Sequence, residues 1–165
     1  MKYKELLVYS DGSYNRKHMS GTYAFIMIDG ETEGIIINES GDVPANLTKS
    51  IWQIASELYA VRELLIRTLE KNLMDIYKKI TIHVDYEGIK QWYERKWKIK
   101  NLQVGSLIHD IRELASMLKA YGTSIEFIKV SAHSGDKYND IVDKMCNEQY
   151  YAEDNKNDKI WKCNK

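Results

Sequence analysis

Two aspartates each follow an apolar run with the composition of a buried strand. Asp11 comes directly after Glu5–Ser10, and Asp85 comes directly after Lys79–Val84. In α/β sheets, ligand sites gather at the carboxyl ends of parallel strands, so neighbouring strands would bring both carboxylates to one edge. Taken singly, either aspartate could do no more than end a strand and begin a turn.

Glu57 falls on the face of a predicted helix that should pack against the sheet. The helix extends from about Ser50 to Asn72, and the apolar Ile54 and Val61 lie three and four residues from Glu57. A buried carboxylate without a partner takes up a proton or destabilises the fold, and a bound cation removes that cost. The alternative is a helix rolled so that Glu57 stays at its solvent edge.

A fourth carboxylate, Asp143, lies in the first turns of the last predicted helix, Asn139–Tyr151. The helix dipole alone favours an acidic side chain there, and Asp140 competes for the same role. Carboxylate oxygens that converge without His or Cys select a hard cation, Mg²⁺ or Mn²⁺, rather than zinc. Two such ions about 4 Å apart suit phosphodiester hydrolysis, in which one activates the attacking water and the other stabilises the leaving oxygen.

The elements that would position these carboxylates follow from periodicity and turn signals. Asp11-Gly12-Ser13 predicts a turn after the first strand, and Asp29-Gly30 predicts a hairpin. The order βββαβαβα indicates an α/β fold with a five-stranded mixed sheet and helices on both faces. The other predicted elements are strands at Thr22–Ile28, Gly34–Asn38 and Ser124–Val130, and a helix at Ser106–Ala120 with Ser106 as N-cap and Gly122 as its stop.

The composition excludes several classes of protein. The chain has 165 residues, 44% hydrophobic and 29% charged, which fits one globular domain. It has no apolar run long enough to span a membrane and no signal-peptide pattern. Cys146 and Cys163 have no metal-site spacing, so we expect reduced thiols in a cytoplasmic protein. The net charge is zero, so a nucleic-acid partner would require basic residues clustered on one surface.

One such cluster is predicted within Gly88–Lys100. Five basic residues stand there with three interleaved aromatic side chains, and basic groups bind phosphates while aromatic rings stack on sugars or bases. The alternative is a solvated helix end with two buried tryptophans. The cluster consists of Lys90, Trp92, Tyr93, Arg95, Lys96, Trp97, Lys98 and Lys100.

Four segments, in identity, order and spacing, resemble the type 1 ribonucleases H. The resemblance covers the chain from about Lys4 to Tyr151, and four motifs in order are far more specific than any one. The segments are Tyr9-Ser10-Asp11-Gly12-Ser13, Ala55-Ser56-Glu57-Leu58, Val84-Asp85-Tyr86-Glu87-Gly88-Ile89, and Ala132-His133-Ser134-Gly135 continuing through Asn139 to Asp143.

The resemblance implies a ribonuclease H-like fold and cleavage of the RNA strand of an RNA–DNA hybrid, leaving 5′-phosphate and 3′-hydroxyl ends. It maps the family's metal-binding tetrad onto Asp11, Glu57, Asp85 and Asp143, which would hold two Mg²⁺ ions with Mn²⁺ as a substitute. Asp143 is preferred to Asp140 because the family's last carboxylate follows the loop histidine, here His133, by ten residues. That histidine would assist proton transfer or product release.

The resemblance also implies a substrate surface. Asn15 and Gln53 would read 2′-hydroxyl groups, which distinguish RNA from DNA. The basic cluster would be a shortened form of the family's DNA-gripping handle. The chain departs from the family at Trp52, where members often carry a polar or basic residue. The expected substrate-binding residues are Gly12, Ser13, Asn15, Gln53, Trp92, Lys96, Trp97, Lys98 and Asn139.

We expect a monomeric enzyme with a catalytic domain at residues 1–152 and a polar tail at 153–165. Three alternatives remain from the sequence. A ribonuclease H domain of a reverse transcriptase would share the chemistry, a DDE transposase or integrase-like core would share the sheet and the metals, and a non-catalytic hybrid-binding module would share the substrate surface.

Overall fold

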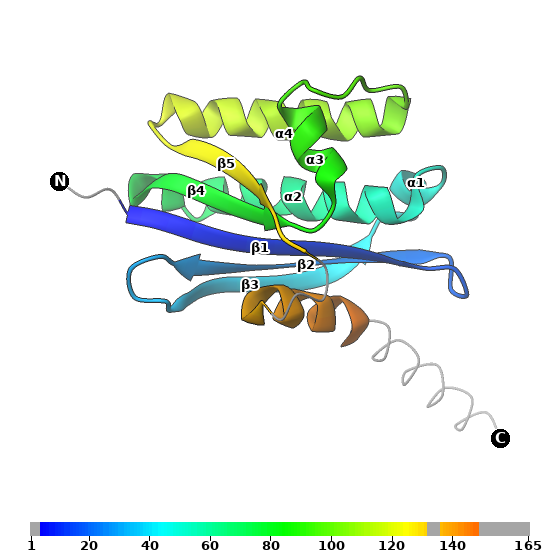
Figure 1. The fold of residues 1–165 in the computed structure, drawn as a ribbon, viewed down its shortest axis with the longest axis horizontal. Coiled ribbons are helices and arrows are strands. Elements are labelled where there is room, and N and C mark those ends of the chain that lie inside the picture. The colour runs from blue at the N-terminus through cyan, green and yellow to red at the C-terminus, as the bar shows by residue number, and fades with distance from the viewer. Residues whose placement is uncertain (1–3, 132–135, 149–165) are drawn as a thin grey trace.

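A long central strand, β1 (Lys4–Asn15), organises the sheet in the computed structural model, which describes residues 4–131 and 136–148 (Figure 1). The described strands form one five-stranded sheet in the order β3-β2-β1-β4-β5. β1 pairs antiparallel with β2 (Ser20–Asp29) and parallel with β4 (Tyr77–Val84). β3 (Ile35–Val43) extends the antiparallel side, and β5 (Ser124–Lys129) extends the parallel side. The predicted mixed sheet is confirmed.

The turn predicted at Asp11-Gly12-Ser13 is wrong, because these residues continue β1. They pair with Ala24, Tyr23 and Thr22 of β2, so the backbone groups that a turn would satisfy locally are satisfied across the sheet. The chain turns later, after Asn15. The last pair between β1 and β4 is Tyr9 with His83, so β1 extends beyond its parallel neighbour.

Helices cover both faces of the sheet (Figure 1). α2 (Trp52–Glu70) and α4 (Leu102–Ala120) pack together on one face, where they bury the larger core. A helix over residues 137–148 covers the other face and buries a smaller cluster. The remaining helices are short: α1 (Ala45–Thr48), the 3₁₀ turn η1 (Leu73–Asp75) and α3 (Glu87–Tyr93).

The start predicted for α4 at Ser106 is wrong. The Asn101 side chain accepts hydrogen bonds from the backbone N–H groups of Gln103 and Val104, at 2.8 and 3.1 Å, and so caps the helix at Leu102. The predicted end is confirmed, because Gly122 has the left-handed φ of 86° that ends helices at a glycine.

Candidate metal centre and its surroundings

Three of the four predicted carboxylates meet at one edge of the sheet. Asp11 lies on the part of β1 that extends past β4, Asp85 follows β4 directly, and Glu57 lies on α2. One ligand oxygen from each of them lies within 4.8 Å of the others. Only 5% of Asp11 and 3% of Glu57 is exposed, which confirms that Glu57 faces the interior. We call these three residues the acidic triad.

A close approach between β1 and α2 brings Glu57 to this edge. A Cβ atom on Gly12 would lie 2.3 Å from the backbone N of Glu57 and 2.6 Å from the carbonyl O of Ser56. On the neighbouring strand, a Cβ atom on Gly21 would lie 2.4 Å from the Ser56 Oγ. Only residues without a side chain allow the helix backbone to lie this close to the sheet.

Burial and like charge oppose ionisation of two members of the triad, Asp11 and Glu57. Burial, and next the charge of Asp85, raise the pKa of the Asp11 carboxyl from 3.8 to about 8. Burial, and next the charges of Asp11 and Asp85, raise the pKa of Glu57 well above its ordinary value. Three carboxylates this close cannot all be charged at neutral pH without a compensating positive charge.

The triad has the features of a hard-cation site. The Glu57 Oε2 atom is buried and has no hydrogen-bond partner among the residues that the structure describes. A buried acceptor left unpaired is costly, and a cation would satisfy it while offsetting the mutual repulsion of the carboxylates. The ligand atoms are all oxygens, which favour Mg²⁺ or Mn²⁺ in a protein site.

Asp143 lies near the triad without being part of it. It is half-buried on the helix over residues 137–148, and its charge contributes to raising the pKa of Asp11. Asp140 is exposed on the same helix. Of the two residues weighed from the sequence, Asp143 is therefore the one whose charge acts on the acidic centre.

Two contacts that the sequence analysis missed connect this helix to the sheet. The Cys146 thiol donates to the backbone carbonyl of Asp11 at 3.6 Å, and the Thr22 hydroxyl donates to the backbone carbonyl of Cys146 at 3.2 Å. Cys146 is fully buried, and burial raises the pKa of its thiol. Nothing in the spacing of a lone buried cysteine could have indicated this contact.

The other predicted site residues have different surroundings. His133 lies outside the described residues. Gln53 is exposed one helical turn before Glu57, and Ser13 is half-buried on β1. The Asn15 Oδ1 atom accepts hydrogen bonds from the N–H groups of the two residues that follow Arg16, and so stabilises the turn after β1. Asn139 is 5% exposed, so its side chain is mostly covered by the protein.

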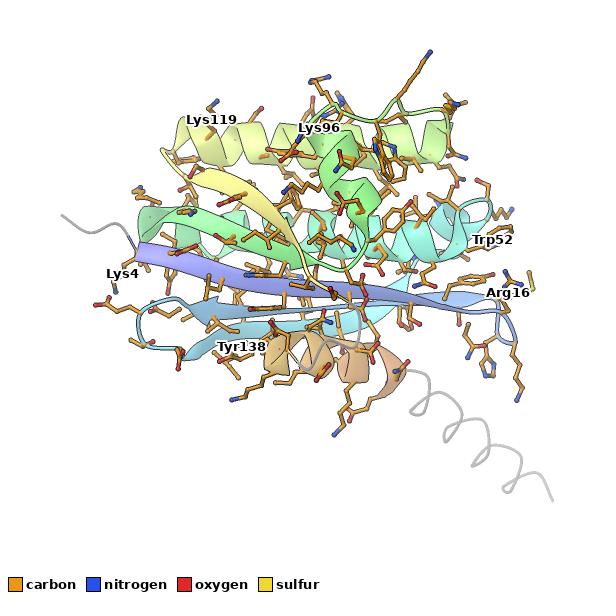
Figure 2. All side chains as sticks on the ribbon, viewed as in Figure 1. Lys4, Arg16, Trp52, Lys96, Lys119 and Tyr138 are labelled. Atoms are coloured by element: carbon orange, nitrogen blue, oxygen red, sulfur yellow. The ribbon has the colours of Figure 1, made fainter. Side chains whose placement is uncertain are left out.

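Trp52, the first residue of α2, lies at the same end of the molecule as Arg16 (Figure 2). Its backbone has a left-handed φ of 39°, and 51% of the residue is exposed. A large indole therefore stands at the entry to α2, the position where the sequence was expected to depart from the pattern it resembles.

The predicted basic cluster forms a groove beside the triad. The groove has a volume of about 620 Å³, and the Trp92 and Trp97 rings meet in it edge to face, with centroids 6.2 Å apart. Tyr86 connects the two sites, because it lines the groove and its pKa is raised by burial and then by the charge of Glu57. The residues lining this basic groove are Ile51, Ile54, Tyr86, Trp92, Lys96, Trp97, Lys98, Lys100, Asn101 and Val104.

Neither tryptophan of the cluster is fully buried. Trp92 is half-buried, and Trp97 is 46% exposed. The alternative of two buried tryptophans is therefore wrong: Trp92 on α3 packs against the core but stays partly exposed, and Trp97 lies on the exposed loop after α3. Three members of the predicted cluster, Lys90, Tyr93 and Arg95, do not line the groove.

Comparison with known proteins agrees with this architecture. The chain is 27% identical over 161 residues to the ribonuclease H of Neorickettsia sennetsu, covering 88% of this chain and 93% of that protein. It is 26% identical over 157 residues to the ribonuclease H of Clostridium botulinum, covering 88% of this chain and 95% of that protein.

Solved structures share the fold at low sequence identity. The RNase H1 of Halobacterium salinarum superposes with a TM-score of 0.67 at 15% identity, covering 90% of this chain and 98% of that one. LC11-RNase H1, solved in complex with an RNA/DNA hybrid, superposes with a TM-score of 0.61 at 13% identity, covering 87% of this chain and 97% of that one.

Within the described residues, no helix is both long and apolar enough to cross a membrane. The sequence pattern of the RNase H family matches residues 3–151, which is most of the chain. On the strength of that match, and of a fold that brings three of the predicted carboxylates together, this protein belongs to the RNase H family.

Proposed function

We propose that this chain is a metal-dependent endoribonuclease that hydrolyses the RNA strand of RNA–DNA hybrids and leaves 5′-phosphate and 3′-hydroxyl ends. The observation that carries the proposal is the acidic triad, whose three carboxylates converge within 4.8 Å on an RNase H fold. Family relatives carry the name ribonuclease H, and a structural neighbour was solved with an RNA/DNA hybrid.

The residues of the triad would hold the metal, with Asp143 as a fourth ligand. Bound Mg²⁺ or Mn²⁺ would supply Lewis-acid stabilisation of the phosphate and a more acidic water. The carboxylates by themselves would repel the phosphates of a substrate, so the cations are needed for binding as well as for chemistry. His133 would move a proton near the scissile bond, as predicted from its place in the motif.

The basic groove would bind the hybrid away from the cleaved bond. Lys96, Lys98 and Lys100 place three positive charges along it, and its two tryptophans offer faces for stacking. Since Tyr86 lines the groove and directly follows Asp85 in the chain, a nucleic-acid strand bound in the groove would continue toward the acidic centre. Gln53, one turn before Glu57, would contact the 2′-hydroxyl groups of the RNA strand.

One gel assay tests this function. End-labelled RNA–DNA hybrid, RNA duplex and DNA duplex of one sequence are incubated with the full chain in Mg²⁺, in Mn²⁺ and in EDTA. We expect cleavage of the RNA in the hybrid only, with either metal and not with EDTA. The matched control is Asp11→Asn, which removes one charge of the triad. Equal cleavage of the DNA duplex, or cleavage by Asp11→Asn at the wild-type rate, would contradict the proposal.

A further inference from the structure

A second basic hollow lies on the helical layer, separate from the basic groove. It has a volume of about 280 Å³ and shares no lining residue with the groove. Figure 2 shows Lys119 and Lys96 at the side of the molecule where α4 lies, with Lys119 toward the far end of that helix. The residues of this α4 hollow are Tyr93, Arg95, Arg112, Ala115, Ser116 and Lys119.

One face of α4 supplies four of the six lining residues. Positions 112, 115, 116 and 119 follow the spacing that places side chains on the same side of a helix. Ala115 is 6% exposed and leaves room between the longer side chains. Arg95 comes from the loop after α3, and Tyr93 packs on Phe127 of β5 with ring centroids 4.8 Å apart. Two segments of the chain therefore form the hollow: α4, and the end of α3 with the loop that follows it.

The cations of the hollow have no acidic partner. The two acids of α4 are engaged elsewhere: Asp110 with Arg62 at 3.2 Å and Glu113 with His109 at 3.2 Å. Glu94, next to Arg95 in the chain, pairs instead with Lys96 at 3.1 Å. Over the ranges that the structure describes, no ion pair is formed by Arg95, Arg112 or Lys119.

The Arg112 guanidinium group is held by one hydrogen bond, but not all of its donors have a partner among the described residues. One of its terminal nitrogens donates to the backbone carbonyl of Trp92, near the end of α3. Its Nε atom is buried and has no hydrogen-bond partner among the described residues. Burial, and next the charge of Arg95, lower the pKa of Arg112. An anion between the two arginines would offset the repulsion of their guanidinium groups.

We propose that the α4 hollow binds a phosphate group. A guanidinium fixed through one nitrogen presents its remaining N–H groups in a planar fork, which fits phosphate oxygens better than chloride. The Ser116 hydroxyl and the Lys119 ammonium add a neutral and a charged donor on the same helix face. The phosphate belongs either to a nucleic-acid backbone or to a free phosphate ion. This inference is independent of the proposed function, because binding requires no cleavage.

The test follows the Arg112 Nε–H and Ser116 backbone signals by ¹H–¹⁵N NMR in the metal-free full chain. Inorganic phosphate replaces chloride at constant ionic strength, and a parallel titration uses an RNA–DNA hybrid. We expect phosphate to shift both signals saturably. Lys119→Gln should weaken phosphate binding by about threefold, on the scale of one screened charge contact. This variant leaves the Arg112–Trp92 contact intact, whereas loss of Arg112 could disturb α3.

The matched control is Lys144→Gln, on the helix that covers the opposite sheet face, where the side chain is 76% exposed. It should bind phosphate as the wild type does. If the hybrid competes with phosphate and is also weakened by Lys119→Gln, the natural ligand is a nucleic-acid phosphate. If it does not compete, the site takes a free phosphate ion. Shifts that do not saturate, or unchanged phosphate affinity in Lys119→Gln, overturn the proposal.

Discussion

The carboxylates of the acidic triad differ in how far the protein covers them. Asp11 and Glu57 are almost fully covered, whereas Asp85 at the end of β4 is half-buried. Neutralising one member relieves repulsion that the fold otherwise bears. The same change would remove a ligand of the proposed cation. Activity and stability should therefore respond to it in opposite directions.

Replacing Asp11 or Asp85 by Asn should lower hybrid cleavage by at least about tenfold, which corresponds to ~1.4 kcal/mol of transition-state stabilisation. The amide keeps the shape of the side chain but removes a charge from the candidate metal site. Single-turnover cleavage measured beside circular dichroism checks the prediction. A well-folded Asp11→Asn or Asp85→Asn variant that keeps more than about a tenth of wild-type activity would show that the triad is not the catalytic centre.

Asp143 and Asp140 offer a matched pair on one helix. Asp143 acts electrostatically on Asp11, whereas Asp140 is exposed. We expect Asp143→Asn to reduce cleavage by an order of magnitude or more and to raise the Mg²⁺ concentration needed for half-maximal rate, since the charge of a proposed ligand is lost. Asp140→Asn should change neither quantity by more than about twofold. If a Mg²⁺ titration showed these losses for Asp140→Asn and not for Asp143→Asn, Asp140 would be the fourth metal ligand instead.

At the scale of elements, the site depends on how closely α2 approaches β1. A methyl group on Gly12 would meet backbone atoms of α2, which cannot move aside as a flexible side-chain end can. Gly12→Ala should therefore destabilise the protein by roughly 1–3 kcal/mol and displace Glu57 from the triad, with loss of activity. Urea unfolding and a hybrid-cleavage assay would measure the two effects.

The control for that variant is Gly105→Ala in α4. A Cβ atom there would lie 3.5 Å from the Ile99 Cγ2, an ordinary contact. Alanine in a helix interior should stabilise the protein by about 0.5–1 kcal/mol and leave activity unchanged. If Gly12→Ala were as stable and active as Gly105→Ala, the close approach of α2 to β1 would have no part in forming the site.

The loop after α3 carries the next prediction. Changing Lys96, Lys98 and Lys100 together to Ala should raise KM far more than it lowers kcat, because these contacts lie away from the cleaved bond. Each lost phosphate contact should also flatten the dependence of log affinity on log salt by about one unit of slope. Steady-state kinetics at several salt concentrations test both effects. An unchanged KM and salt slope would mean that the hybrid is bound elsewhere.

For the whole molecule, we expect the acidic triad to couple stability to pH and to metal binding. The pKa of Asp11 rises from 3.8 to about 8 on folding. A carboxyl whose pKa is raised contributes stability that is present below the unfolded pKa and is lost as the pH rises through the folded pKa. The metal-free protein should therefore lose stability between about pH 4 and pH 8, on the order of 1–3 kcal/mol.

Thermal unfolding across that pH range, with and without Mg²⁺, measures the coupling. Mg²⁺ should raise the Tm most at the upper end, because a ligand that binds only the folded state stabilises it. In Asp11→Asn, the Tm should depend less on pH and should rise less with Mg²⁺. Without metal at pH 8, the Tm of this variant should exceed that of the wild type. A wild-type Tm that is independent of pH and Mg²⁺ would contradict this coupling.

Local patterns in the sequence determined the elements and three members of the site. Apolar runs and helical spacing located the strands and α2, and the period of α2 placed Glu57 toward the interior. Motif order then connected Asp11, Glu57 and Asp85, which the structure brings together. The elements and the inward face of α2 depend on neighbouring residues in the chain, so periodicity carries them, whereas the grouping of the three carboxylates came from the resemblance to the type 1 ribonucleases H.

Tertiary contacts decided the rest. The pairing of Asp11-Gly12-Ser13 with β2 overrode a local turn signal, and Gly12 is needed because Ser56, far away in the chain, lies against it. The Cys146 contact with Asp11 and the α4 hollow around Arg112 join segments whose proximity no local pattern records. The sequence shows which residues can carry a charge. Whether a given charge is neutralised depends on the groups that pack beside it, and only the folded chain determines which groups those are.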